Sequence, residues 1–294
     1  MMDEMTLKAL AKINLGLDVV RRREDGYHEV KMIIQTIHLY DRLHIKKSSK
    51  PGIRIGTNLS FLPVNESNLV YKAASLLIQE FGIKEGVEVQ LEKRIPVAAG
   101  MAGGSTDGAA MLYGMNQMFE LGLSKEELMQ RGLKLGADVP YCIMRGTALA
   151  EGIGEKLTPI APMVKCLVLI AKPAVSVSTK MVYQNLKLDE HTMHPDIDLL
   201  RKDIEEQDLS AICAHMGNLL ETVTIPLYPV IEKLKDRMRK EGALAAMMSG
   251  SGPTVFGLFD NEETAKRAKE SLRGEGLAKQ IYLTSIYNNC RTKT

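Results

Sequence analysis

The stretch "PVAAGMAGGSTDGAA", residues 96–110, decides how the rest of the chain is interpreted. Its glycines are not followed by the lysine of the G-x-x-x-x-G-K-[ST] phosphate loop, and their spacing is not that of the G-x-G-x-x-G dinucleotide fingerprint. Glycines nevertheless permit positive φ angles, and consecutive backbone N–H groups attract anions. The stretch is therefore a candidate phosphate loop, with a mobile surface turn as the alternative.

The residues on either side of this stretch predict a strand before it and a helix after it. "GVEVQLEKRIP", residues 86–96, alternates apolar and polar positions, as half-buried strands do. Residues 109–113 begin an apolar, helix-favouring run, and Ser105 and Thr106 are candidate N-caps for it. A glycine-rich turn that ends at a helix N-terminus presents both N–H groups and the positive end of the helix dipole to a phosphate.

Length and composition indicate a globular protein of one large domain or two ordinary ones. The chain has 294 residues, of which 45% are hydrophobic and 25% charged. The net charge of +2 gives no general electrostatic argument for nucleic-acid binding. Two short basic runs, Arg21–Arg23 and Lys46–Lys47, are interpreted as solvated loops.

The cysteines and the N-terminus indicate a protein of the cytoplasm. None of the four cysteines belongs to a C-x-x-C pair or has a histidine at ligand spacing, so we expect reduced thiols rather than a zinc site or a disulfide framework. These residues are Cys142, Cys166, Cys213 and Cys290. The N-terminus is not a signal peptide, and no stretch approaches the roughly 18 apolar residues that span a membrane. We therefore expect neither a membrane nor a nucleic acid as a partner.

Hydrophobic periodicity predicts an α+β fold with antiparallel strand pairing at least in part. A helix is expected in "SNLVYKAASLLIQEFG", residues 67–82, with Gly82 ending it. Ser124 and Glu127 form a capping box that begins a helix expected to stop near Gly136. "ADVPYC", residues 137–142, is expected to be a turn.

The second half of the chain alternates strands and helices without a strict β-α-β order. Two prolines and little periodicity in residues 155–163 predict a domain boundary there. Strands are expected at 165–172, 243–248, 254–259 and 280–287, and helices at 208–222, 229–240 and 261–274.

Two charged residues in apolar surroundings are candidate catalytic groups. Lys12 lies in "ALAKINLGLDV", residues 9–19, where a lysine is costly to bury unless it is paired or functional. Asp138 follows a helix end and precedes Val139 and Pro140. The alternatives are that Lys12 extends its ammonium to solvent and that Asp138 caps a turn. Together with a phosphate loop, a buried lysine and a carboxylate form a set suited to phosphoryl transfer.

The chain resembles the superfamily that includes galactokinase, homoserine kinase and mevalonate kinase, the GHMP kinases. Three motifs match in order: "LAKINLGLDV" at 10–19, the glycine-rich stretch at 96–110 and "MMSGSGPTVFGLF" at 247–259. "GYHE" at 26–29 and "LGADVP" at 135–140 narrow the resemblance to the members that act on a CDP-linked methylerythritol. The match covers nearly the whole chain.

The resemblance implies a two-domain α+β fold. An N-terminal ATP-binding domain with a left-handed β-α-β unit is expected at residues 1–160, and a ferredoxin-like C-terminal domain at residues 161–294, with the active site in the cleft between them. The implied reaction is ATP-dependent phosphorylation of the 2-hydroxyl of 4-diphosphocytidyl-2-C-methyl-D-erythritol in non-mevalonate isoprenoid biosynthesis. ATP and Mg²⁺ are the implied cofactors, and the protein is expected to be a monomer or homodimer.

The resemblance also implies a role for each candidate residue. Asp138 corresponds to the catalytic carboxylate and Lys12 to the catalytic lysine. The implied ATP contacts are Pro96, Val97, Ala98, Ala99, Gly100, Met101, Ala102, Gly103, Gly104, Ser105 and Thr106, with Asn68 and Lys93 as neighbours of the adenine. The implied acceptor contacts are Asn14, Tyr27, His28, Thr179 and Tyr183, with the rings of Tyr27 and Tyr183 facing a cytosine and His28 at its edge.

Two departures and two alternatives accompany this interpretation. Many GHMP kinases have glycine where this chain has Ala98, Ala99 and Ala102, and alanine excludes some positive-φ conformations. Many have Asn in place of Asp107, whose carboxylate either repels phosphate or helps to hold magnesium.

The alternative functions are another small-molecule kinase, of the mevalonate or homoserine type, and a non-enzymatic nucleotide-binding relative. "DGYHE", residues 25–29, is otherwise a hairpin turn with Tyr27 and His28 packed beneath it.

Overall fold

The computed structural model describes residues 2–289, which form two compact units built from interleaved segments of the chain. Unit 1 contains the described residues within 2–11, 39–97 and 102–144, and unit 2 those within 12–38, 98–101 and 145–289. The two long strands β1 (Glu4–Arg22) and β2 (His28–Ser48) therefore contribute residues to both units. Because the segments interleave, the units do not correspond to one cut along the chain, and the boundary at residue 160 stays a prediction.

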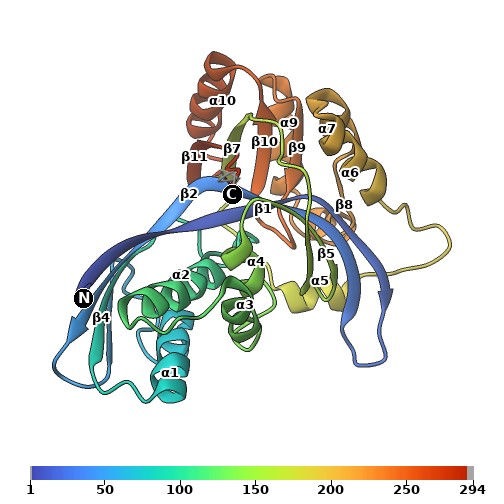
Figure 1. The fold of residues 1–294 in the computed structure, drawn as a ribbon. Helices are drawn as coiled ribbons and strands as arrows, with labels where there is room; N and C mark the ends of the chain where they lie inside the picture. Colours follow the sequence, from blue (N-terminus) through green and yellow to red (C-terminus); the bar gives the residue numbers. More distant parts are fainter. Residues whose placement is uncertain (1, 290–294) are drawn as a thin grey trace. The chain divides into compact units, whose positions relative to one another are not determined.

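Unit 1 combines strand pairing with a helical layer. Its β3 (Ile53–Thr57) and β4 (Gly86–Glu92) are parallel neighbours, with Ile53 opposite Val87. The connection between them contains α1 (Leu69–Phe81), so the three elements form a β-α-β unit of the kind that the resemblance implies. The end of β2 pairs antiparallel with β4. In Figure 1, α1 lies beside α2 (Gly103–Met118), and the two helices pack against each other.

Local sequence explains where the helices of unit 1 begin and end. The Asn68 side chain accepts a hydrogen bond from the Val70 N–H at the start of α1, and Gly82 ends the helix with a φ of 62°. Ser124 and Glu127 form the predicted capping box of α3 (Lys125–Leu133). These two predictions are confirmed, because each depends only on residues that are close in sequence.

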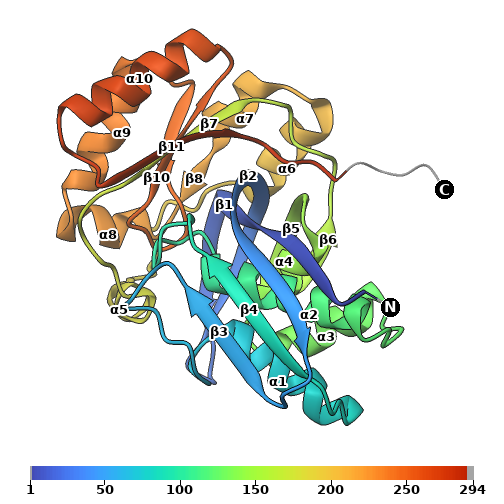
Figure 2. The same cartoon turned by 90° about the vertical axis from the view of Figure 1, so that its left-hand side faces the viewer.

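Unit 2 contains a second sheet whose neighbouring strands are all antiparallel. Its order is β11-β7-β10-β9, and all residues of β10 are buried. The helices α9 and α10 pack against this sheet, as Figure 2 shows. The bounds are β7 (Leu167–Lys172), α9 (Val230–Lys240), β9 (Ala245–Met248), β10 (Val255–Phe259), α10 (Glu262–Gly274) and β11 (Gln280–Ser285). The α+β prediction with partly antiparallel pairing is confirmed.

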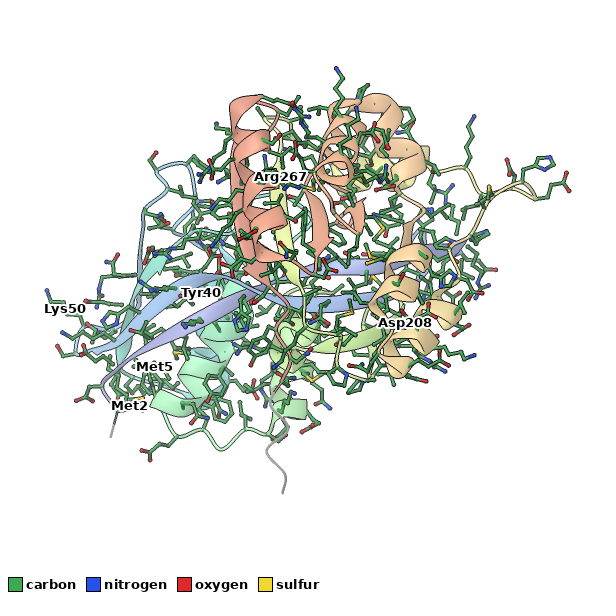
Figure 3. All side chains as sticks on the ribbon, turned by 90° about the horizontal axis from the view of Figure 1, so that it is seen from above. Met2, Met5, Tyr40, Lys50, Asp208 and Arg267 are labelled. Atoms are coloured by element: carbon green, nitrogen blue, oxygen red, sulfur yellow. The ribbon has the colours of Figure 1, made fainter. Side chains whose placement is uncertain are left out.

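The described part of unit 2 also contains three short strands and four helices. β5 (Thr147–Gly152) pairs antiparallel with β2 and with β6 (Lys156–Pro159), and β8 (Gly217–Asn218) pairs parallel with β1. The helices are α5 (Thr179–Asn185), α6 (Ile197–Glu206), α7 (Leu209–His215) and α8 (Glu221–Leu227). The Asp208 side chain caps α7. The Arg267 side chain of α10 donates a hydrogen bond to the carboxylate of Glu241, the residue that follows α9. Asp208 and Arg267 are labelled in Figure 3.

Three sequence predictions of local structure are wrong. The helix α2 begins at Gly103 after a left-handed Ala102, so Ser105 and Thr106 lie inside its first turn rather than at its N-cap. Most of the turn expected at 137–142 is instead the start of α4 (Val139–Met144). The helix tolerates Pro140 because proline lacks a backbone N–H, and the N–H groups of a first turn have no partner within the helix. The helix expected at 208–222 is broken into α7 and α8 by β8, whose pairing with β1 sequence periodicity cannot reveal.

The described cysteines are not joined by disulfides. Cys142, Cys166 and Cys213 form no disulfide, and Cys290 lies outside the described residues. Burial raises the pKa of Cys166 to about 12 and that of Cys213 to about 11, so both thiols stay protonated at neutral pH. Between residues 2 and 289, no helix has the length and apolar character needed to cross a bilayer.

A buried ionic cluster joins β2, the end of β4 and α2 inside unit 1. The Lys93 ammonium binds Asp41 and lies 2.7 Å from Oδ2 of Asp107, and all three side chains are almost fully buried. Asp41 also accepts hydrogen bonds from the backbone N–H groups of Arg94 and Ile95. The cluster therefore fixes the chain immediately before the glycine-rich loop to the helix immediately after it.

The cluster contains two carboxyl groups and one ammonium, and this imbalance changes its proton affinity. Burial raises the pKa of Asp107 well above its usual range, and the neighbouring Asp41 adds to the effect against the opposing charge of Lys93. The two carboxylates outweigh burial at Lys93 and raise its pKa. Oδ1 of Asp107 is buried and has no hydrogen-bond partner among the described residues.

Replacing Asp107 with Asn should remove part of the pH dependence of stability. A carboxyl group whose pKa is raised by folding takes up a proton, so wild-type stability falls as pH rises from the ordinary Asp range through the raised pKa. Asn mimics the protonated group. The variant should match the wild type below about pH 4, the ordinary Asp range, and exceed it increasingly as the pH rises toward the raised pKa, by about 1.4 kcal/mol for each unit of pKa increase. Urea unfolding across this pH range measures the difference.

The matched control is Asp41→Asn, which weakens the acceptor of two backbone N–H groups as well as the ion pair. This variant should be less stable than the wild type by about 3 kcal/mol or more, the cost of breaking a buried pair. A stability difference between Asp107→Asn and wild type that stays constant with pH would contradict the interpretation of the cluster.

Candidate active site

A pocket of about 510 Å³ lies in unit 2, between the turn that joins β1 to β2 and helix α5. It brings together four of the five residues expected to contact the acceptor, which come from two segments about 150 residues apart. These four are Tyr27, His28, Thr179 and Tyr183. The fifth, Asn14, is not one of its lining residues.

Two rings face each other in this pocket. The ring centroids of His28 and Tyr183 are 5.0 Å apart, with an angle of 33° between their planes. Burial lowers the pKa of His28, and the nearby positive charge of Arg22 lowers it further. The imidazole is therefore neutral at neutral pH and offers one donor and one acceptor.

Tyr27 lies at the rim of the pocket. The turn before it is held by hydrogen bonds from the Tyr27 N–H to the Asp25 carboxylate and from the Arg23 N–H to the Tyr27 carbonyl. The hairpin turn predicted as an alternative is therefore present. Tyr27 is nevertheless 61% exposed, so the expectation that it packs beneath the turn is wrong. An exposed ring at the rim of a pocket is available to a ligand.

Lys12 and Asn14 lie together on the buried middle of β1. The Lys12 Nζ donates to Asn14 Oδ1 at 2.6 Å, and the Asn14 amide contacts the Met32 sulfur at 3.2 Å. Lys12 is only 6% exposed, so the alternative in which it extends to solvent is wrong. A buried lysine that is hydrogen-bonded on a rigid strand is held in one position, as a reacting group must be.

The three GHMP motifs contribute residues that meet inside unit 2. The Lys12 N–H of the first motif donates to the Met101 carbonyl of the loop at 3.3 Å. The Ser249 hydroxyl of the third motif donates to the Gly100 carbonyl at 3.0 Å. A Cβ atom on Gly100 would lie 2.1 Å from the Ser249 carbonyl oxygen, so only glycine fits there. This part of the loop is therefore packed, and a mobile surface turn does not describe it.

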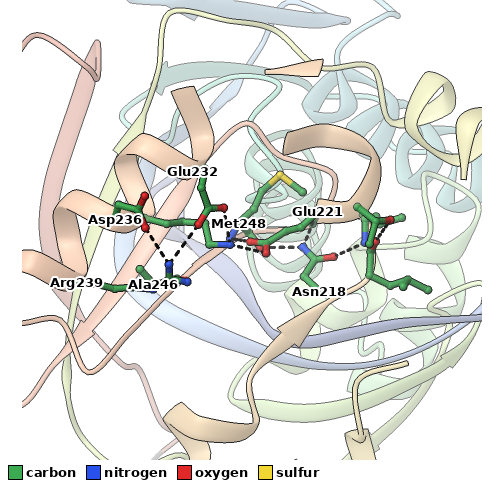
Figure 4. A network of polar contacts seen from close by, with 12 residues as sticks. Asn218, Glu221, Glu232, Asp236, Arg239, Ala246 and Met248 are labelled. Atoms are coloured by element: carbon green, nitrogen blue, oxygen red, sulfur yellow. Dashed lines mark hydrogen bonds and ion pairs between the residues drawn. The ribbon is translucent and has the colours of Figure 1, made fainter. Parts of the chain in front are cut away.

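A polar network holds the third motif in place (Figure 4). The Asn218 amide donates to the carbonyl groups of Met248 and Gly250, both at 2.8 Å. Oε1 of Glu221 accepts from the Met248 N–H at 2.7 Å, while its Oε2 binds the Lys235 ammonium at the same distance. Strand β9 and the turn after it are thus fixed to β8 and α8.

The rest of the loop, in unit 1, leads into the N-terminus of α2. Ala102 has a φ of 55° and directly precedes Gly103, the first residue of the helix. In unit 2, Ala98 has a φ of 50°. Both alanines thus adopt the left-handed region, which costs a non-glycine residue about 1–2 kcal/mol each.

The remaining predicted residues have structural partners in unit 1. Asn68 caps α1 and donates to the Pro63 carbonyl, and Lys93 belongs to the buried ionic cluster. Asp138 is half-buried directly before α4, where its carbonyl accepts from the Cys142 N–H at 3.1 Å. Their roles toward adenine and phosphoryl groups stay predictions.

The residues present offer no cage of protein ligands to a metal ion. Within residues 2–289, no three His, Cys, Asp or Glu side chains are grouped to hold one. Asp107 is buried and binds the Lys93 ammonium, and its two alternative roles toward phosphate and magnesium stay predictions.

Sequence reasoning missed several residues that shape the site. Arg22 and Lys180 line the pocket, and Asn218 and Glu221 hold the third motif. Arg22 was hidden within a basic run that suggested a solvated loop. Asn218 and Glu221 lie in a segment expected to be one helix, and no local pattern marked their distant partners.

Comparisons with known proteins agree with this geometry. The model of the GHMP kinase N-terminal domain matches residues 68–146, and that of the C-terminal domain matches residues 200–278. A kinase named for 4-diphosphocytidyl-2-C-methyl-D-erythritol in Lachnospira eligens is 55% identical over 97% of this chain and 99% of its own length. A kinase with the same name in Lachnoclostridium phytofermentans is 56% identical over 98% of this chain and 99% of its own length.

Solved structures give the same result. A crystal structure of 4-(cytidine 5'-diphospho)-2C-methyl-D-erythritol kinase superposes with a TM-score of 0.84 at 32% identity and covers 97% of this chain and 100% of the other. Mevalonate kinase from L. major has a TM-score of 0.73 at 16% identity, covers 98% of each chain, and shows the shared fold alone. The protein is therefore a GHMP kinase and belongs to the 4-diphosphocytidyl-2-C-methyl-D-erythritol kinase family.

Proposed function

We propose that this kinase transfers the γ-phosphoryl group of ATP to the 2-hydroxyl of 4-diphosphocytidyl-2-C-methyl-D-erythritol in non-mevalonate isoprenoid biosynthesis. The observation that supports this substrate best is the pocket of Tyr27, His28, Thr179 and Tyr183. It offers rings for the faces of a pyrimidine and a neutral imidazole for its edge. We place the enzyme in the cytoplasm, as a monomer or homodimer.

The proposed mechanism assigns one chemical role to each candidate catalytic residue. Asp138 accepts the proton of the acceptor hydroxyl as that oxygen attacks the phosphorus. The Lys12 ammonium stabilises negative charge on the transferring phosphoryl group. Asn14, which accepts from Lys12, holds the ammonium in place. Little covalent chemistry is left to the protein, so positioning supplies much of the rate enhancement.

The loop from Pro96 to Thr106 is proposed to bind the ATP phosphates. The left-handed residues at 98, 100 and 102 turn successive backbone N–H groups, and α2 adds the positive end of its dipole. Mg²⁺, when bound through the phosphates, neutralises part of their charge. Asn68 and Lys93 are proposed to be neighbours of the adenine.

The pocket of Tyr27, His28, Thr179 and Tyr183, here called the cytidine pocket, distinguishes this proposal from its alternatives. Mevalonate and homoserine have no base, so a kinase for either would have no use for the paired rings of His28 and Tyr183. A non-enzymatic nucleotide-binding protein would not need a buried lysine such as Lys12. An assay with radiolabelled ATP and the three acceptors in parallel tests all three. Label transfer only to the CDP-linked acceptor is expected, and transfer to mevalonate or homoserine instead would overturn the proposal.

Asp138→Asn should lower turnover by about 10²–10⁴, the range typical of general-base loss, because the amide cannot accept the proton. The variant should bind cytidine and melt as the wild type does. Initial-rate kinetics, with circular dichroism to monitor folding, provide the measurement. Asp3→Asn, which changes an exposed carboxylate next to β1, is the control and should have normal turnover. Normal turnover in Asp138→Asn would remove this residue from the mechanism.

Tyr27→Ala should raise KM for the CDP-linked acceptor about tenfold for each 1.4 kcal/mol of lost contact. Its KM for ATP and its melting temperature should change little, because the ring is 61% exposed and supports little of the core. Tyr113→Ala is the matched control, since Tyr113 is an exposed tyrosine of α2 that does not line the pocket. A lowered melting temperature with an unchanged acceptor KM would show that Tyr27 serves the turn and not the substrate.

A further inference from the structure

The three consecutive arginines Arg21–Arg23, of which the first two end β1, have different surroundings. Arg21 pairs with Glu29 at 2.6 Å, and Arg23 pairs with Asp25 at 2.7 Å. Arg22 lies between them, lines the cytidine pocket and forms no salt bridge within residues 2–289. Arg21 and Arg22 are the last two residues of β1, and side chains alternate between the two faces of a strand, so Arg22 points to the opposite face from Arg21. The run is therefore not a uniformly solvated loop.

A second cation without a salt bridge lines the same pocket from the opposite segment. Lys180 is in the first turn of α5, between Thr179 and the rest of the helix, and no described carboxylate pairs with it. The residues lining the pocket include these two cations and no Asp or Glu. A cavity with one sign of charge attracts ligands of the opposite sign.

The charge of Arg22 acts on the pocket itself. It contributes to lowering the pKa of His28, after the larger effect of burial. An uncharged nucleoside would make use of the rings and the imidazole but not of this charge. A diphosphate attached to the nucleoside would compensate it, because phosphate oxygens accept strong hydrogen bonds from guanidinium and ammonium groups.

We propose that Arg22 and Lys180 are specificity-determining residues that bind the diphosphate of the acceptor, so that the pocket selects a nucleoside diphosphate over the bare nucleoside. This inference rests on the proposed function of the pocket. It assigns a ligand to the one arginine of the run that has no carboxylate partner in the described chain.

Calorimetric titration with ligands that differ only in charge tests this inference. Cytidine and CDP are titrated into the full-length protein, with the ATP site saturated by a non-hydrolysable ATP analogue so that CDP reports on the acceptor pocket. The variants are Arg22→Gln, Lys180→Gln and the double substitution. Arg21→Gln is the matched control, since this neighbouring arginine pairs with Glu29 and does not line the pocket.

CDP should bind the wild type more tightly than cytidine does. Each pocket variant should weaken CDP binding by up to about fivefold, the upper end of the range for solvated charge pairs, and cytidine binding less than twofold. Added salt should weaken CDP binding to the wild type more than to the double variant. In turnover assays, KM for the acceptor should rise while kcat stays the same.

Three outcomes would overturn the inference. Equal affinity of the wild type for cytidine and CDP would show that the pocket does not recognise the diphosphate. Equal weakening of both ligands in the variants would assign Arg22 and Lys180 to the shape of the pocket instead. Failure of the wild type to bind either ligand would overturn the proposed function as well, which separates the two hypotheses.

Discussion

The structure of unit 2 around the loop depends on a steric constraint at one residue. The Ser249 carbonyl oxygen occupies the space that a Cβ atom of residue 100 would need, and Gly100 also has a φ of 73°. This contact allows the Ser249 hydroxyl to reach the Gly100 carbonyl and places the loop next to the backbone of Lys12. The turn that supplies Ser249 is itself fixed by Asn218 and Glu221. The three motifs are thus connected by backbone contacts that tolerate no side chain at position 100.

Charge compensation separates the structural cations of this protein from those proposed to bind ligand. Lys93 is buried with two carboxylates, and the excess negative charge is expressed as a raised pKa of Asp107. Such a cluster fixes the chain on both sides of the loop, and it has no charge to offer to a phosphate. Arg22 and Lys180 lie at a surface pocket where the described residues provide no carboxylate. A cation that the fold leaves uncompensated is the more useful one for binding an anion, because binding breaks no ion pair.

The parts of this fold that local sequence determines were predictable. Asn68, Gly82 and the Ser124 capping box set helix ends through contacts within a few residues. The errors occur where distant segments decide the conformation. Ala102 adopts a left-handed conformation that alanine disfavours, and Gly217–Asn218 leaves a helical pattern to pair with β1. The residues proposed to contact the acceptor came from family resemblance, which links Tyr27 with Tyr183 across the chain. Arg22 was missed because a run of arginines does not show which member lacks a partner until the turn brings Glu29 and Asp25 back to the other two.

In the proposed cytidine pocket, the charge of Arg22 supports the role of the neighbouring imidazole of His28. His28 must be neutral to offer both a donor and an acceptor to a base edge, and burial together with Arg22 keeps its pKa below the usual value. The same arginine is available to the diphosphate. A bound diphosphate would offset the charge of Arg22 and so weaken its effect on the imidazole, but burial, the larger cause, would remain and would increase on binding. Recognition of the base therefore does not depend on the charge that recognises the phosphates, and both contacts can contribute remote binding energy that aligns the acceptor hydroxyl for attack.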